Sequence, residues 1–206
     1  MFYSNDTALN LGISTTSDAI GIPGLTYLEN YLNVDYQNQL INIINQQNWS
    51  KILNRRVQHY GYKYDYKKGS LASSSYLGAL PDWAQSLANQ LYQDGLTAKV
   101  PDQVIVNEYE PGQGIRSHID CFPCFGNTII SLSLSSPCVM DFTHSLTQEK
   151  VSILLEPGGV LVMQGAARYD WQHGIAARKK DTYKGTKFIR TRRVSVTFRE
   201  VLFPYK

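Results

Sequence analysis

A histidine and an aspartate two positions apart, His118 and Asp120, are the first residues whose types and spacing suggest chemistry. In an extended chain alternate side chains point to the same face, so the imidazole and the carboxylate could reach one metal ion. A second histidine from elsewhere would complete a set of two imidazoles and one carboxylate. That set leaves coordination positions open and suits non-haem Fe(II).

A candidate for the second histidine is His173, which is followed at once by a glycine in the run Trp-Gln-His-Gly-Ile. It comes soon after the apolar run 159–163. A histidine in such a place is more often a satisfied core or turn residue than a metal ligand. Spacing alone therefore leaves both interpretations open.

A polar face on a strand near the C-terminus is the next feature. From 193 to 199 the chain alternates with period two, and one face is apolar. The other face carries Arg193, Ser195, Thr197 and Arg199. A solvated edge strand would explain these residues, and so would an arginine fork that binds a carboxylate at two points.

These motifs follow one another in a characteristic order. Asn-x-Tyr begins at 107, Pro-Gly at 111, His-x-Asp at 118, His-Gly-Ile at 173, and Arg-x-Ser-x-Thr-Phe-Arg at 193. In this order the chain resembles the AlkB family of Fe(II)- and 2-oxoglutarate-dependent dioxygenases. The resemblance covers the C-terminal half best and extends more loosely back to 55–62. Within the family, that segment and the run NEYEPGQGI are most similar to the animal homologue that hydroxylates a modified wobble uridine in tRNA.

The resemblance implies roles for individual residues. The catalytic iron ligands would be His118, Asp120 and His173. The residues that bind 2-oxoglutarate would be Asn107, Tyr109, Arg193, Ser195 and Arg199. Family members that read the amino group of adenine often carry an acidic residue two places after the metal aspartate, where this chain has Phe122. Watson–Crick recognition of adenine or cytosine is therefore not implied.

The implied reaction uses Fe(II), 2-oxoglutarate and O2 to hydroxylate a carbon, and it releases succinate and CO2. A hydroxylated N-methyl group would leave as formaldehyde and restore the base, whereas a hydroxyl on a carbon not attached to nitrogen would stay. The expected partner is nucleic acid, either single-stranded or tRNA, because a base in a duplex must first be flipped out. The alternative is the same chemistry on a protein, a lipid or a small molecule.

Tyrosines and cations alternate in the segment from 55 to 66, which is expected to be a strand with four tyrosines on one side. Such rings could cover a sheet face or stack on unpaired bases, and nearby arginines could contact phosphates. We favour a substrate-binding lid. The candidate substrate-binding residues in this segment are Arg55, Arg56, Tyr60, Tyr62 and Tyr64. Phe122, two positions after the metal aspartate, is a further candidate.

Positive charge is concentrated between 168 and 199, where ten Lys or Arg stand against two Asp, although the whole chain has a net charge of only +3. We interpret 178–192 as a mobile basic loop that favours a phosphate-bearing substrate. Cys121 and Cys124 follow the metal aspartate, but a structural zinc site needs four ligands and Cys138 is the only other thiol. We therefore expect incidental thiols in a reducing cytosol.

The elements that must position these residues form one domain. A chain of 206 residues, 43% of them hydrophobic, is long enough for a substantial core. Residues 1–21 are expected to be a loose arm and 22–206 a single dioxygenase domain. A signal peptide and a membrane-spanning run are both missing from the sequence, so we expect a cytoplasmic, monomeric protein without membrane contact.

Two helices are expected before a series of strands. Asp35 would cap the first helix, which runs to about 47, and the second would begin at Pro81. The strands are expected around 103–109, 127–134, 137–142, 149–155, 159–163 and 190–199. Such spacing predicts a sandwich or barrel, and with the helices an α+β fold. The resemblance implies a double-stranded β-helix, or jelly roll, with helices backing one sheet and iron at one open end.

Overall fold

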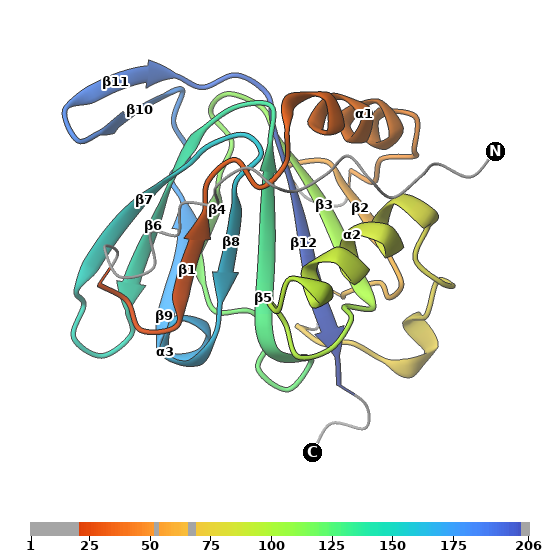
Figure 1. Ribbon diagram of the computed structural model, residues 1–206. Helices are drawn as coiled ribbons and strands as arrows, with labels where there is room; N and C mark the ends of the chain where they lie inside the picture. Colours follow the sequence, from red (N-terminus) through yellow and green to blue (C-terminus); the bar gives the residue numbers. More distant parts are fainter. Residues whose placement is uncertain (1–20, 52–53, 66–68, 203–206) are drawn as a thin grey trace.

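Two antiparallel β-sheets face each other in the computed structural model, and helices cover the outer side of the larger sheet (Figure 1). The structure describes residues 21–51, 54–65 and 69–202, so the expected N-terminal arm lies almost wholly outside the described residues. None of the helices in the described ranges has the length and apolar character needed to span a bilayer. The monomeric state and the cytoplasmic location stay predictions.

The larger sheet has the strand order β1-β8-β5-β12-β3-β2, and all of its neighbouring strands are antiparallel. The strands are β1 (Leu25–Leu28), β8 (Val160–Met163), β5 (Phe125–Leu134), β12 (Arg193–Val201), β3 (Gln103–Tyr109) and β2 (Val57–Tyr60). The alternation predicted for β12 is realised. Val194, Val196 and Phe198 pack under the helices, while the polar face turns to the interior between the sheets.

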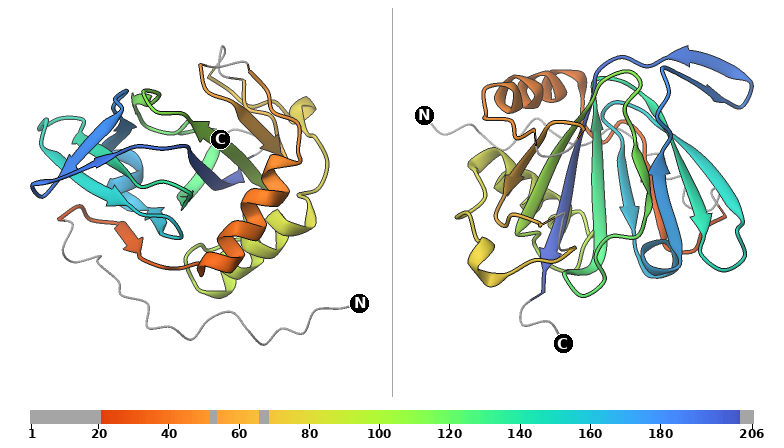
Figure 2. Two further views of the ribbon diagram at one scale, coloured as in Figure 1. Left: turned by 90° about the horizontal axis from the view of Figure 1, so that it is seen from above. Right: turned by 180° about the vertical axis from the view of Figure 1, so that it is seen from behind.

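The helices α1 (Val34–Asn45) and α2 (Asp82–Gln93) lie side by side across the outer face of the larger sheet (Figure 2). Their apolar residues, among them Leu40, Ile44 and Leu87, join the same core as the outward side chains of that sheet. The predicted cap of α1 was wrong. Asn33 caps it, because its side chain accepts a hydrogen bond from the Tyr36 backbone N–H at 2.8 Å.

The smaller sheet has the order β4-β9-β6-β7. Its strands are β4 (Ile115–His118), β9 (Trp171–Ile175), β6 (Cys138–His144) and β7 (Lys150–Leu155). The short helix α3 (Gly165–Tyr169) joins β8 to β9. The predicted jelly roll, with helices backing one of its two sheets, is confirmed, and the predicted central strands are found within a few residues of their expected bounds. The short strands β1, β4 and β9 were not predicted.

The basic segment 178–192 is an ordered hairpin and not the mobile loop that was predicted. Its strands are β10 (Lys180–Tyr183) and β11 (Thr186–Ile189), which pair across a two-residue turn with positive φ at both positions. The buried carboxylate of Asp181 accepts hydrogen bonds from Arg178, Arg190 and the Val139 backbone N–H. Several of the counted charges therefore stabilise the hairpin on the smaller sheet.

Candidate active site and metal centre

The two histidines are brought together by pairing between β4 and β9. His118 lies directly opposite His173, with ring centroids 4.5 Å apart. The glycine after His173 makes this approach possible, because a Cβ at Gly174 would lie 2.9 Å from the backbone of Ser117. Gly114, in the turn before β4, is equally constrained, since its Cβ would lie 2.2 Å from a backbone oxygen of β9. Larger residues at either place would push the strands apart.

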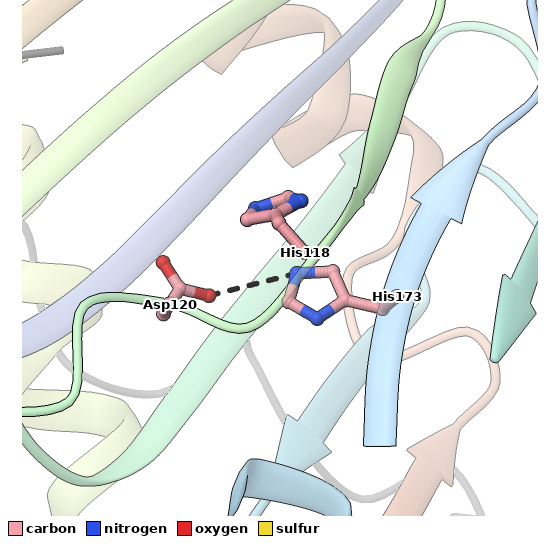
Figure 3. A group of neighbouring side chains, drawn as sticks. All are labelled: His118, Asp120 and His173. Carbon is pink, nitrogen blue, oxygen red and sulfur yellow. Dashed lines mark ion pairs between the residues drawn. The ribbon is translucent and has the colours of Figure 1, made fainter. Parts of the chain in front are cut away.

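Asp120 follows β4 and completes a group in which all three side chains point toward one another (Figure 3). One ligand atom from each residue lies within 4.8 Å of the others. The Nδ1 atom of His118 is 2.8 Å from the Arg116 carbonyl, to which it must donate, and this leaves Nε2 as a lone-pair donor. The donor set of two imidazoles and one carboxylate fits Fe(II).

The charges around Asp120 keep it ionised. Its Oδ1 accepts a hydrogen bond from Arg199 Nη1 at 2.7 Å, and its Oδ2 lies 3.5 Å from His173 Nε2. Burial by itself would raise the pKa of Asp120, but the positive Arg199 and the two imidazoles outweigh burial and lower it to about 2. Burial lowers the pKa of His173 to about 4. Both groups are therefore in their metal-binding forms at neutral pH.

A cavity of about 780 Å³ lies between the sheets and contains this group. The register of β3, β12 and β5 places Asn107, Ser195 and Ser133 in one cross-strand row, with Tyr109 opposite Arg193 in the next. All the residues predicted to bind 2-oxoglutarate line the cavity: Asn107, Tyr109, Arg193, Ser195 and Arg199. The polar face of β12 is therefore an interior surface, and the solvated-edge interpretation is wrong.

The two buried arginines of β12 have unused donors. Arg193 donates from Nη2 to Ser133 Oγ at 2.8 Å, but its Nε finds no hydrogen-bond partner among the described residues. The Nε of Arg199 likewise has no hydrogen-bond partner among the described residues. A buried cation with a free N–H is costly unless an anion is bound beside it. The site therefore fits a carboxylate ligand such as 2-oxoglutarate.

Buried apolar side chains form a further part of the cavity wall, and sequence patterns gave no sign that they would meet there. They come from five strands, namely Ile105, Ile129, Met140, Met163 and Ile175. In sequence these residues are ordinary strand apolar positions, and only the facing of the two sheets directs them into one cavity. They limit the number of water molecules that can share the space with a bound ligand.

Two of the predicted substrate residues line the cavity, namely Arg55 and Tyr64. Arg55 Nε donates to Asn107 Oδ1 at 2.9 Å, and its guanidinium lies 5.5 Å from the centroid of the Tyr109 ring. Arg56 points away from the cavity and pairs with Glu108. Of these two arginines, only Arg55 lines the cavity.

The remaining lid candidates lie outside the cavity lining. Tyr60 packs edge-on against Trp83 of α2, with ring centroids 5.4 Å apart, and Tyr62 packs against Tyr76. Phe122 is 67% exposed and contacts Tyr169. The expected four-tyrosine face was wrong because β2 ends at Tyr60, where the positive φ of the following glycine turns the chain. The fourth tyrosine, at 66, lies outside the described residues.

Cys121 and Cys124 form a disulfide, so the expectation of two incidental thiols was wrong. The turn after Asp120 brings their Cα atoms to 5.3 Å, a separation that a disulfide can bridge. Cys138 is a free, buried thiol.

Arg168 is a residue that sequence reasoning missed, because it was counted only as part of the positive charge between 168 and 199. It is only 2% exposed, and its Nη1 donates to the Asp120 backbone carbonyl at 2.9 Å. Its other donors reach the carbonyls of Cys121 and Gly126. The side chain therefore holds the loop that carries the metal aspartate, and an arginine in a short helix offers no sequence signal for this role.

Comparisons with known proteins agree with this geometry. The model of a family described as the 2OG-Fe(II) oxygenase superfamily matches residues 24–199. An uncharacterized protein of Acanthamoeba polyphaga mimivirus is 34% identical, over 89% of this chain and 88% of its own length. The tRNA (carboxymethyluridine(34)-5-O)-methyltransferase ALKBH8 of Mus musculus is 38% identical over 80% of this chain, which matches only 26% of that protein's length.

Solved structures share the fold. The structure of OsALKBH1 superposes with a TM-score of 0.61 at 21% sequence identity, and the match covers 86% of this chain and 97% of that chain. A Pseudomonas putida prolyl-4-hydroxylase superposes with a TM-score of 0.56 at 15% identity, over 90% of this chain and 96% of that chain. The two solved proteins bear different names, so the shared fold leaves the substrate open.

Proposed function

The chain belongs to the 2OG-Fe(II) oxygenase superfamily and is an Fe(II)/2-oxoglutarate-dependent dioxygenase, and we propose that it oxidises alkyl groups on nucleic acid bases. The observation that carries the proposal is the convergence of His118, Asp120 and His173 beside two buried arginines with unused donors. The proposed substrate class is single-stranded nucleic acid or tRNA, and tRNA is the first substrate to test.

The metal ligands are proposed to be His118, Asp120 and His173. Arg199 holds Oδ1 of Asp120, so Oδ2 is the carboxylate oxygen free to face a metal. Arg168 fixes the backbone of the same residue. When bound, iron, 2-oxoglutarate and O2 supply the oxidation of a C–H bond, coupled to conversion of 2-oxoglutarate to succinate and CO2.

The co-substrate is proposed to lie along β12. Arg193 would bind the 2-oxoglutarate carboxylate that lies farther from the metal. Its Nε is unused, and a guanidinium can hold a carboxylate at two points. The Cζ atom of this guanidinium lies 5.4 Å from the centroid of the Tyr109 ring. Asn107 and Ser195 offer polar groups on the neighbouring cross-strand row. Arg199 would face the end of 2-oxoglutarate that lies nearer the metal.

The nucleic acid substrate is supported by two observations. The chain is 38% identical to a protein named for modification of a tRNA uridine, although it spans about a quarter of that protein, so the methyltransferase activity in the name is not carried over. Arg55 and Arg116 also line the cavity, where they suit a phosphate-bearing ligand. The apolar wall would hold the alkyl group near the metal and limit water.

The proposal is tested by mass spectrometry after incubating the protein with Fe(II), 2-oxoglutarate, ascorbate and O2. The substrates are methylated single-stranded DNA, methylated RNA and bulk tRNA. We expect loss of a methyl mass from an N-alkylated base, or a gained oxygen on a tRNA base. If every nucleic acid is returned unchanged while succinate forms, the substrate class is a protein, a lipid or a small molecule instead.

A further inference from the structure

A second hollow of about 610 Å³, the outer groove, adjoins the active-site cavity. The two spaces share lining residues that lie just before β2, at the start of β4 and at the end of β9, namely Asn54, Arg55, Gly114, Ile115, Arg116 and Ile175. The outer groove is therefore continuous with the cavity that holds the candidate metal centre. A ligand that lies in both would pass over Arg55 and Arg116.

The floor of the outer groove is the outer face of the smaller sheet. Phe142 of β6 faces the core, so its neighbours Asp141 and Thr143 point outward. On β7, Ser152 and Lys150 lie opposite them. On the other side of β6, Asp141 is paired with a glycine of β9, which has no side chain to fill the space. Small residues in the middle of a sheet face therefore produce the hollow.

The lining suits a sugar–phosphate backbone. Its cations are Arg55, Arg116 and Lys150, and Lys179 lies at the rim against the groove residue Gly112. Hydroxyl groups come from Ser117 and Thr143, while the hydroxyl of Ser152 donates to Asp141. Among the described lining residues the one carboxylate is Asp141, and its Oδ1 already accepts a hydrogen bond from Ser152 at 2.6 Å. Arginine, lysine and hydroxyl side chains are the usual partners of phosphate oxygens.

Aromatic side chains are missing from the described lining of the outer groove, although stacking on aromatics is how unpaired bases are usually held. A strand in the groove would thus be bound through its phosphates and not through its bases. Such contacts position a strand without reading its sequence. The base to be oxidised would leave the strand at the shared residues and enter the active-site cavity.

Resting on the proposed function, we propose that the outer groove binds the single-stranded nucleic acid segment that flanks the oxidised base. Arg116 and Lys150 contact successive phosphates, and Arg55 lies where the strand turns into the cavity. Charge complementarity and continuity with the active-site cavity favour this occupant. The contacts are independent of the flanking sequence.

The test compares the double variant Arg116→Ala/Lys150→Ala with a matched control, Lys184→Ala/Lys187→Ala, whose exposed lysines lie on the β10–β11 hairpin and line neither space. Binding of a labelled single-stranded RNA to the Mn(II)- and 2-oxoglutarate-loaded protein is measured over a salt series. Loss of two phosphate contacts should reduce the slope of log K against log salt by about 1.4 in magnitude. The control should keep the wild-type slope.

Strand length gives a second readout. The loss of kcat/KM in the groove variant should be larger for a long oligonucleotide than for a trinucleotide, because a trinucleotide has few flanking phosphates to lose. The groove assignment would be overturned by an equal loss of kcat/KM in the hairpin control or by an unchanged salt slope in the groove variant. Equally tight binding of a polyglutamate peptide in competition would overturn it as well. Thermal unfolding of both variants checks that the sheets are intact.

The two proposals fail in different ways. If the wild-type protein oxidises RNA and the groove variant binds and oxidises it equally well, only the groove assignment is wrong. If the wild-type protein forms succinate but neither binds nor oxidises any nucleic acid, the proposed substrate class is wrong, and the groove assignment falls with it.

Discussion

Replacing Arg193 tests the proposed co-substrate site directly. Arg193 is 3% exposed, its guanidinium donates a hydrogen bond to Ser133, and it keeps one buried N–H without a partner among the described residues. Arg193→Lys retains the positive charge but loses the planar fork that can bind a carboxylate at two points. Arg193→Gln removes the charge as well. The two variants therefore separate geometry from charge.

The expected losses follow from the burial of this group. A hydrogen bond to a charged group contributes about 1.5–3 kcal/mol, so Arg193→Lys should weaken 2-oxoglutarate binding roughly 10- to 100-fold. Truncating one partner of a buried charge pair costs about 2–5 kcal/mol, so Arg193→Gln should weaken it roughly 30-fold to a few thousand-fold. Affinity is measured by titration calorimetry of 2-oxoglutarate into the Mn(II)-loaded protein, which does not turn over.

The neighbouring arginine provides the matched control. Arg192 is bound to Glu108 and Asn45 and does not line the cavity. Arg192→Lys should therefore leave the affinity for 2-oxoglutarate unchanged, and all variants should keep wild-type affinity for Mn(II). Unchanged 2-oxoglutarate binding in Arg193→Gln, or an equal loss in Arg192→Lys, would refute the reasoning.

Three further substitutions test the metal centre and the fold. His118→Ala should abolish metal binding and succinate formation, as followed by metal analysis and product assay; retained turnover would contradict the ligand assignment. Gly174→Ala should weaken Mn(II) binding because its Cβ would meet the β4 backbone at 2.9 Å, and wild-type metal affinity would show that the strands can separate without cost. Asp181→Asn should lower the free energy of unfolding by about 3–5 kcal/mol in denaturant titrations at neutral pH, since it leaves two arginines without their carboxylate. Burial would raise the pKa of Asp181, but hydrogen bonds from Arg190, Val139 and Arg178 outweigh burial and lower it. The difference in unfolding free energy between wild type and Asp181→Asn should therefore be complete above about pH 4 and vanish as pH falls through the folded pKa. A difference that persists in acid would contradict the ion-pair explanation.

Residue types and their order were enough to predict the candidate metal ligands and the family. Only a few side chains bind Fe(II), so His118, Asp120 and His173 stand out even though more than fifty residues separate the last from the others. Period-two alternation likewise predicted the polar face of β12. With nine residues, β12 shows this alternation over enough positions to be recognised.

Short elements could not be predicted in the same way. β4 and β9 have four and five residues, too few for a clear period, yet their pairing is what opposes the two histidines. The roles of charged residues were equally hidden. Arg168 and Arg190 look alike in sequence, but one holds the loop after Asp120 and the other neutralises a carboxylate in a hairpin.

The composition of the chain thus specified which chemistry is available, because ligand atoms and charge are properties of single residues. Where those groups meet depends on strand register and on how the two sheets face each other. Both depend on contacts between residues far apart in sequence, which no local pattern records. The active-site cavity, the unused donors of its arginines and the outer groove beside it therefore became visible only in the folded chain.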